Sequence, residues 1–344
     1  MVRTKWIILI LAAIAVVGCK KKETPAPAAE EQAAAVEQEK PAPAPAEPIQ
    51  PLPESVEVDM EKVVLGRSLY HDTILSGDGT VSCATCHMLD HGGAEPRKTS
   101  TGIRGQKGPI NSPTVLNSAY NFVQFWDGRA KDLQEQAAGP VANPIEMGAV
   151  WDEVVAKIKK EDEYAAAFAK LYEDGVTQDN ITDAIAEYEK SLITPSRFDK
   201  YLRGDASALT DQEKRGYQTF KEVGCTACHA GVLAGGAMFQ KLGLVKDYFA
   251  DRGTPLTEAD MGRFNVTKNP ADKHFFKVPT LRNVELTPPY LHDGSRETLE
   301  ETVAVMGRYQ LGRELTQQQV NDIVAFLKSL TGELPPHAKM PEGS

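Results

Sequence analysis

Apolar side chains recur at helical spacing in several stretches of the first half of the chain. Over residues 56–70 they fall on one face, and Asp59 is a candidate N-cap for this helix. The same spacing occurs over residues 150–173 and 180–193, and Pro195 marks the end of the last stretch. These patterns predict helices and give no sign of a βαβ repeat.

The second half shows the same kind of pattern. Thr210 and Glu213 have the spacing of a capping box that opens a helix, and residues 316–330 carry an apolar face suited to a closing helix. Residues 92–113 and 231–279 are instead irregular and rich in Gly or Pro. No stretch alternates convincingly like a strand, so we expect a mainly α fold.

A five-residue motif occurs twice, each time after a predicted helix. In this motif two cysteines, three positions apart, bond to the vinyl groups of one haem, and the histidine that follows ligates the iron. A redox dithiol, half of a zinc site and a disulfide are the alternatives, but both copies carry the trailing histidine. The two copies are Cys83, Cys86, His87 and Cys225, Cys228, His229. The sequence therefore predicts two cytochrome c-like domains, each with one covalently attached c-type haem.

The second axial position of each iron decides what that haem can do. Met306 lies late in the second half, where cytochrome c domains often place a thioether ligand. A methionine opposite His229 would raise the haem potential and close the iron to other ligands. Methionine is also a common core residue, so the residues alone leave both interpretations of Met306 open.

The N-terminal residues predict export and a flexible connection. Residues 1–18 have a basic start, a short apolar run and a small residue before Cys19, as in a lipoprotein signal peptide; a simple cleaved leader and an N-terminal anchor are the alternatives. Residues 19–54 are rich in Ala, Pro and Glu and predict a disordered tether. We expect the two haem domains to span residues 55–204 and 205–344.

Charge and leader together suggest where the protein works and with what. The formal net charge of −10 argues against nucleic acid and favours a basic redox protein as partner. We expect the periplasm or cell envelope, with the chain held at the membrane by a lipid on Cys19. Lys20 follows that cysteine in place of the Asp that favours the inner membrane, so the outer membrane is favoured.

Longer segments around the two motifs carry a specific resemblance. Residues 56–330 resemble the bacterial di-haem cytochrome c peroxidases, in order and in register with both haem motifs. The segments that carry it are residues 106–109, 111–117, 124–129, 281–284 and 289–294, with the stretch around Met306.

The resemblance implies a division of roles between the haems. The haem on His87 would be the low-potential peroxidatic site, where hydrogen peroxide reacts. The haem on His229 and Met306 would be the high-potential site, which receives electrons from a small monohaem cytochrome c or a cupredoxin. Trp126 matches the aromatic residue between the haems, although a core tryptophan is the simpler interpretation. The family also implies a homodimer.

Further site residues come from the same resemblance. Glu146 matches the catalytic acid and base, which would move a proton between the two peroxide oxygens, and Gln136 matches a distal-pocket amide. A surface glutamate at a helix start is the alternative for Glu146. A calcium site is implied at Asn111, Thr287 and Pro289, the last two through their backbone carbonyls.

One position departs from the family pattern. Many relatives have a histidine at the position of Ile103, which caps the peroxidatic iron until the other haem is reduced. Isoleucine cannot ligate iron, and His71 and His91 are poor substitutes by position. We therefore expect an enzyme that is active without prior reduction, unless the loop brings His91 round.

Two other functions compete with a peroxidase. A non-catalytic di-haem electron-transfer lipoprotein would not need Glu146. Related enzymes that oxidise tryptophan residues of a partner protein replace the methionine ligand with tyrosine, so Met306 argues against that class.

Overall fold

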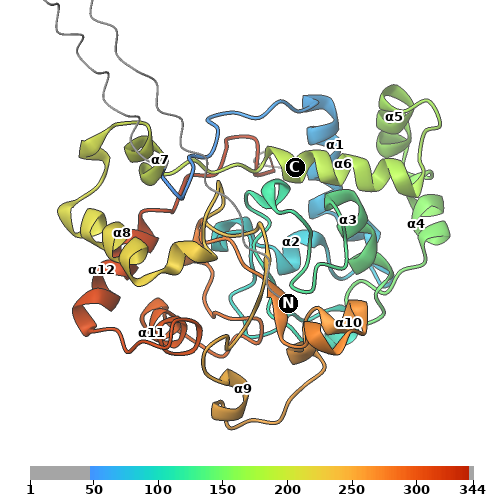
Figure 1. Cartoon of the computed structure of the whole chain (residues 1–344). Coiled ribbons are helices and arrows are strands. Elements are labelled where there is room, and N and C mark those ends of the chain that lie inside the picture. The colour runs from blue at the N-terminus through green and yellow to red at the C-terminus, as the bar shows by residue number, and fades with distance from the viewer. Residues whose placement is uncertain (1–46, 341–344) are drawn as a thin grey trace, which may run out of the picture. The chain divides into compact units, whose positions relative to one another are not determined.

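The computed structural model describes residues 47–340, which belong to one compact unit (Figure 1). The predicted leader, Cys19 and most of the predicted tether lie outside the described residues. Within residues 47–340, no helix has the length and apolar character needed to cross a membrane.

The first half of the described chain is helical, as the apolar spacing predicts. The side chain of Asp59 accepts hydrogen bonds from the backbone at the start of the first helix, which confirms it as the N-cap. The periodic stretch 150–173 is divided between two helices, because the backbone is extended at Glu161. The helices are α1 (Met60–His71), α2 (Cys83–Cys86), α3 (Leu133–Ala142), α4 (Trp151–Ile158), α5 (Asp162–Leu171), α6 (Gln178–Ser191) and α7 (Arg197–Leu202).

The second half adds further helices and one small antiparallel sheet. The capping box of Thr210 and Glu213 is present at the start of α8. The elements are α8 (Asp211–Val223), β1 (Phe239–Lys241), α9 (Tyr248–Asp251), α10 (Phe264–Thr267), β2 (Phe275–Lys277), α11 (Leu299–Gln310) and α12 (Gln317–Lys328). Strand β1 pairs with β2, so that Phe239 lies opposite Lys277. These strands are too short to show an alternating pattern, and the expected mainly α fold is confirmed.

The same helix crossing occurs twice and positions both haem motifs. Helix α1 lies along α6, and α8 lies along α12. Each crossing has a glycine where a Cβ would meet the partner's backbone: Gly66 would place it 1.9 Å from the Ala184 carbonyl oxygen, and Gly216 would place it 1.8 Å from that of Asp322. Only glycine allows backbones this close. Each motif follows the glycine-bearing helix, so the crossing determines where its cysteines lie.

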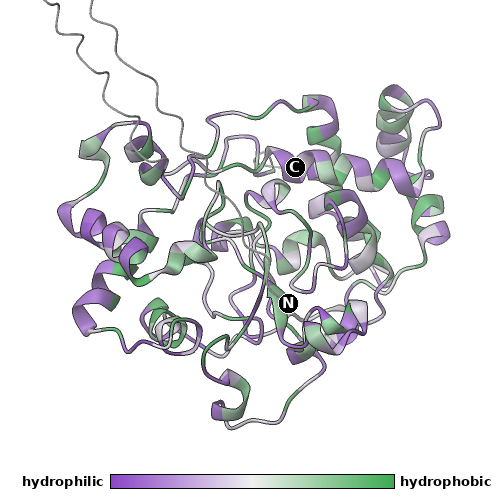
Figure 2. Ribbon diagram, in the orientation of Figure 1, coloured by the Kyte–Doolittle hydropathy of each residue, from purple (hydrophilic) through white to green (hydrophobic). Residues whose placement is uncertain are grey.

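Each crossing is surrounded by its own buried apolar cluster. Around α8 and α12, Phe198, Tyr217, Phe220 and Phe326 pack with ring centroids about 5 Å apart. Around α1 and α6 the cluster is largely aliphatic and extends to α3, α4 and α5. In Figure 2 the ribbons of α8 and α12 each carry both hydrophilic and hydrophobic residues.

The folded part begins earlier than the sequence predicts. We expected residues 19–54 to be a tether, but Ile49 and Leu52 are fully buried. Ile49 forms a bridge with Gly231, and the Leu52 amide donates to Asp199 at 2.8 Å. The prediction was wrong for residues 47–54, because a few apolar side chains among the prolines suffice to bind a strip of chain to a preformed core.

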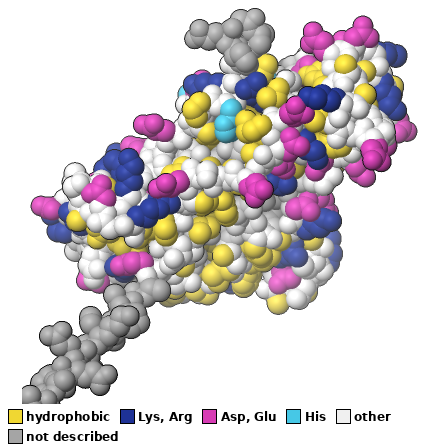
Figure 3. All heavy atoms as spheres, turned by 90° about the horizontal axis from the view of Figure 1, so that it is seen from above, with side chains coloured by type: hydrophobic (Ala, Val, Ile, Leu, Met, Phe, Trp, Pro, Cys, Tyr) yellow, Lys and Arg dark blue, Asp and Glu magenta, His cyan; other side chains and the backbone are white. Residues whose placement is uncertain are grey.

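The surface is mixed in character. On the face drawn in Figure 3, charged side chains occupy both flanks, and hydrophobic side chains gather between them. The exposed large hydrophobic residues among those described include Leu244, Val245 and Leu256, in the irregular segment after β1.

Candidate active site

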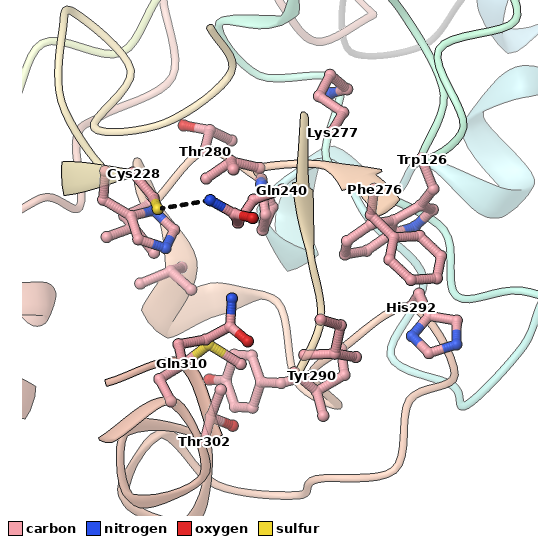
Figure 4. A pocket seen from close by; sticks show the side chains of 18 of the residues that line it. Trp126, Cys228, Gln240, Phe276, Lys277, Thr280, Tyr290, His292, Thr302 and Gln310 are labelled. Carbon is pink, nitrogen blue, oxygen red and sulfur yellow. Dashed lines mark hydrogen bonds between the residues drawn. The ribbon is translucent and has the colours of Figure 1, made fainter. Parts of the chain in front are cut away.

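Each haem motif opens into a large cavity of its own. The first cavity is lined by Cys83, Cys86 and His87 and encloses about 1330 Å³ of non-protein space, counting its opening. The second is lined by Cys225, Cys228 and His229 and encloses about 1630 Å³ (Figure 4). The two predicted attachment sites therefore each face a space suited to a large flat cofactor.

Both motif histidines are held in the orientation that an iron ligand needs. The ring Nδ1 of His87 lies 3.1 Å from the Pro113 carbonyl oxygen, and that of His229 lies 3.0 Å from the Ala234 carbonyl oxygen. If Nδ1 donates its proton there, Nε2 is left with a free lone pair, which is the usual arrangement of a ligating histidine. Burial lowers the pKa of both rings, so both are neutral and able to bind metal.

The motif cysteines are unlike those of a redox dithiol. Burial raises the pKa of the thiols of Cys83 and Cys225 to about 12 and that of Cys86 to about 11. A reactive dithiol needs the opposite shift, because the thiolate is the nucleophile. The thiols are also not paired in disulfides. These environments disfavour the dithiol and disulfide alternatives and fit thioether attachment of haem.

The second cavity contains both candidate ligands of its iron. Met306 reaches it from α11, and His229 reaches it from the loop after α8. Figure 4 shows that Thr302 and Gln310, also on α11, lie at the same edge of the cavity. Met306 and His229 therefore line the same cavity, as the ligand interpretation of Met306 requires.

The first cavity contains Glu146 and Gln136. Glu146 follows α3 in a tight turn, and its carboxylate accepts a hydrogen bond from the Asn143 side chain at 3.0 Å. Burial raises the pKa of Glu146, and Arg129 and Asn143 partly oppose this shift. Gln136 reaches the cavity from α3. The structure thus brings together two residues that the family resemblance singles out.

Ile103 lies outside the first cavity. It is buried in the aliphatic core. Its Cδ1 lies 2.3 Å from the position that a Cβ on Gly148 would take. The Ile103 amide donates to the Glu146 carbonyl oxygen at 2.8 Å, so this loop also supports the turn that carries Glu146. Among the described residues, His87 is the one histidine that lines this cavity. His71 and His91 do not line it.

Seven residues line both cavities and so separate the two haem sites. Trp126 is one, and its indole N–H donates to the Asn111 carbonyl oxygen at 2.9 Å. Its ring meets those of Phe276 and His292 edge to face. The seven residues, which we call the partition, are Asn111, Ser112, Pro113, Thr114, Asn121, Trp126 and Lys277. Trp126 thus lies between the two sites, as its family match implies.

The residues of the predicted calcium site all belong to the wall of the second cavity. Asn111, Thr287 and Pro289 all line it. The Asn111 amide N–H₂ donates to the Arg97 carbonyl oxygen at 3.1 Å, which leaves its Oδ1 as the available ligand atom. Within residues 47–340, the carbonyl oxygens of Thr287 and Pro289 accept no hydrogen bond. Calcium prefers oxygen ligands of these kinds.

Sequence reasoning missed several residues of these cavities. Glu189 on α6 lines the first cavity, and burial raises its pKa to about 8. Arg129 lines the same cavity, with its guanidinium 3.4 Å from the centre of the Phe125 ring. Lys277 lines both cavities. The one signal in the sequence was the position of Lys277 between Phe276 and Val278. A charged residue inside a short apolar run is unusual and indicates a specific role.

Two paired helix crossings, each followed by a haem motif and a cavity, define a di-haem c-type cytochrome. Comparison with known proteins agrees. Residues 60–207 match the family described as di-haem cytochrome c peroxidase, and residues 213–331 match cytochrome c.

Individual relatives extend this match over most of the chain. The chain is 54% identical to cytochrome c peroxidase Ccp of Escherichia coli over 85% of its own length, but spans only 62% of that protein. It is 49% identical to cytochrome c551 peroxidase of Nitrosomonas europaea, over 84% of this chain and 85% of the relative. The crystal structure of a MauG-like protein associated with microbial copper homeostasis is 30% identical, with a TM-score of 0.73, and covers 86% of this chain and 97% of that one. The chain therefore belongs to the di-haem cytochrome c peroxidase family, and it binds two c-type haems.

Proposed function

We propose that the chain is a peroxidase that reduces hydrogen peroxide to two molecules of water, using two electrons and two protons. The observation that carries the proposal is Glu146, a carboxyl group with a raised pKa in the same cavity as the first haem motif. A protein that only transfers electrons has no use for such a group. The names of the relatives support the same activity.

The chemistry of peroxide cleavage explains the need for Glu146. When bound, the first haem supplies an iron that binds peroxide and passes electrons to it. The carboxylate of Glu146 takes the proton from the inner peroxide oxygen and returns it to the outer one, which then leaves as water. A raised pKa suits both halves of this transfer, because the same group must accept the proton and then release it.

Neighbouring side chains hold Glu146 ready for this role. The Asn143 amide fixes one carboxylate oxygen, and the charge of Arg129 stabilises the ionised form. Gln136 offers an amide that can orient peroxide by hydrogen bonding. The hydrogen bond from Asn143 restricts the carboxyl group without neutralising it.

The second cavity suits electron entry. His229 and Met306 would together hold the iron of its haem, which would keep peroxide from binding there and would raise the haem potential. Electrons from a small monohaem cytochrome c or a cupredoxin would enter here and pass Trp126 to the first haem.

The loop that contains Ile103 bears on activation. We infer that the first iron has an open position when both haems are oxidised, because Ile103 is anchored in the core and its backbone supports Glu146. No reductive displacement of a histidine is then required before turnover.

Other features of the proposal rest on the sequence and the family. A calcium ion at Asn111, Thr287 and Pro289 is supported by their free oxygen atoms. Attachment to the outer membrane through Cys19, location in the periplasm and homodimer formation remain proposals of the same kind. The division between the two haem domains at residues 204 and 205 is also a proposal.

Replacement of Glu146 tests the activity. Glu146→Gln keeps the shape and removes the proton acceptor, so we expect peroxide reduction to fall by about 10²–10⁴-fold. Haem content and the reduction of the second haem by a donor should stay unchanged. Glu153→Gln, at an exposed glutamate of α4, is the matched control and should keep full activity. Full activity in Glu146→Gln would overturn the role given to Glu146, whereas an unaltered protein that reduces no peroxide would favour the non-catalytic electron-transfer lipoprotein.

A further inference from the structure

Lys277 is the charged member of the partition between the two haem cavities. The other six members are neutral. Lys277 ends strand β2, and its amide donates to the Trp126 carbonyl oxygen at 2.8 Å, so its backbone is fixed beside the residue that lies between the haem sites. In Figure 4 its side chain lies at the opposite edge of the second cavity from Thr302 and Gln310.

This lysine is buried without a counter-charge from the protein. It is only 7% exposed, and within residues 47–340 no carboxylate forms an ion pair with it. Burial alone lowers its pKa to about 8, and no acidic neighbour opposes the shift. Lysine is almost never buried unless it is paired, because removing an ammonium group from water costs several kcal/mol.

The missing counter-charge has to come from what fills the cavities. Each haem carries two carboxylate side chains at its edge, and Lys277 borders the space of both haems. A buried ammonium next to a buried carboxylate is stabilised by a charge-assisted hydrogen bond. A lysine on the protein surface needs no such carboxylate partner. A buried lysine at the wall between two carboxylate-bearing cofactors does need one.

We propose that Lys277 is the shared electrostatic partner of the carboxylates of both haems, and that its charge holds up the reduction potential of each. A positive charge near an iron favours the reduced state, which carries one positive charge less. One residue at the partition therefore biases both haems in the same direction. The inference depends on the bound haems and not on which of them reduces peroxide. Lys277 is in this sense a positioning residue rather than a catalytic one.

The test is a redox titration of the full-length protein with both haems bound, followed by optical spectroscopy without peroxide. Lys277→Met keeps most of the volume and removes the charge. For both haems we expect the equilibrium constant for reduction to fall by at least about tenfold, which is about 59 mV for a one-electron couple. Lys277→Arg should stay much closer to the wild type, because it keeps the charge. Lys241→Met is the matched control on the paired strand; Lys241 is exposed, and its loss should leave both potentials unchanged.

Three results would overturn the proposal. They are unchanged potentials in Lys277→Met, a shift confined to one haem, and an equal shift in Lys277→Arg, which would point to shape rather than charge. If Lys277→Met binds less than two haems, Lys277→Gln is titrated in its place and judged by the same results. The potentials are measured in Lys277→Met without peroxide, and the activity is measured in Glu146→Gln with it, so the two proposals can fail separately.

Discussion

The glycine at the crossing of α8 and α12 should be intolerant of even one methyl group. In Gly216→Ala the new Cβ would lie 1.8 Å from the Asp322 carbonyl oxygen and 2.9 Å from the Phe326 Cβ. Real Cβ contacts essentially never fall below 3.0 Å. To bring the 1.8 Å contact up to this limit, the two helices must separate by about 1.2 Å. Both neighbours belong to rigid parts of α12, and a side-chain rotation cannot relieve the contact.

The net effect is the difference between two opposing terms. Overpacking of this kind costs up to about 3 kcal/mol. Alanine in a helix is more favourable than glycine by about 1 kcal/mol. We therefore expect Gly216→Ala to lower the free energy of unfolding by about 2 kcal/mol. In a chain of this size that lowers Tm by several degrees.

Unfolding in guanidinium, followed by far-ultraviolet circular dichroism and by haem absorbance, measures this change. Gln218→Ala is the control, because Gln218 is an exposed residue of the same helix and lies away from the crossing. This control should change the free energy of unfolding by no more than about 0.5 kcal/mol, as is usual for surface substitutions. A Gly216→Ala protein as stable as Gln218→Ala would refute the argument from the close crossing.

Three further predictions follow from the cavities and the core. Electron paramagnetic resonance of the oxidised protein should show a high-spin ferric signal from the first haem, because Ile103 offers no ligand; two low-spin signals would contradict this. Peroxidase activity should fall as the pH drops through the raised pKa of Glu146, since the ionised carboxylate accepts the proton, so the acid limb should lie above the 4.5 of an ordinary glutamate and vanish in Glu146→Gln. Asp199→Ala should lower the free energy of unfolding by about 3–5 kcal/mol, because it leaves Arg282 buried and unpaired. Asp199 and Arg282 are both 0% exposed and 2.9 Å apart. The exposed pair of Asp211 and Lys214 is the control, and Asp211→Ala should change the unfolding energy little.

Features with a local physical cause could be predicted from the sequence. Thioether attachment needs two cysteines and a histidine within five residues, so the haem motifs are complete without tertiary contacts. Helix starts depend on hydrogen bonds over three positions, as at Asp59 and Thr210. For the same reason the helix before the first motif could be located from apolar spacing, and the helix before the second motif from its capping box. The tether was placed too far along the chain, because the burial of Ile49 depends on contacts with Gly231 that spacing does not show.

Tertiary structure decided the features that join distant segments. Met306 could be a ligand or a core residue until α11 placed it in the cavity of His229. Glu146 gains its raised pKa from burial and its orientation from Asn143, and Arg129 reaches the same cavity from an earlier loop. The apolar run around Lys277 marks it as unusual but does not place it, because it becomes a charge between two haem sites only when two halves of the chain meet. Covalent and helical order arise from neighbours in sequence, whereas burial and electrostatic environment arise from neighbours in space.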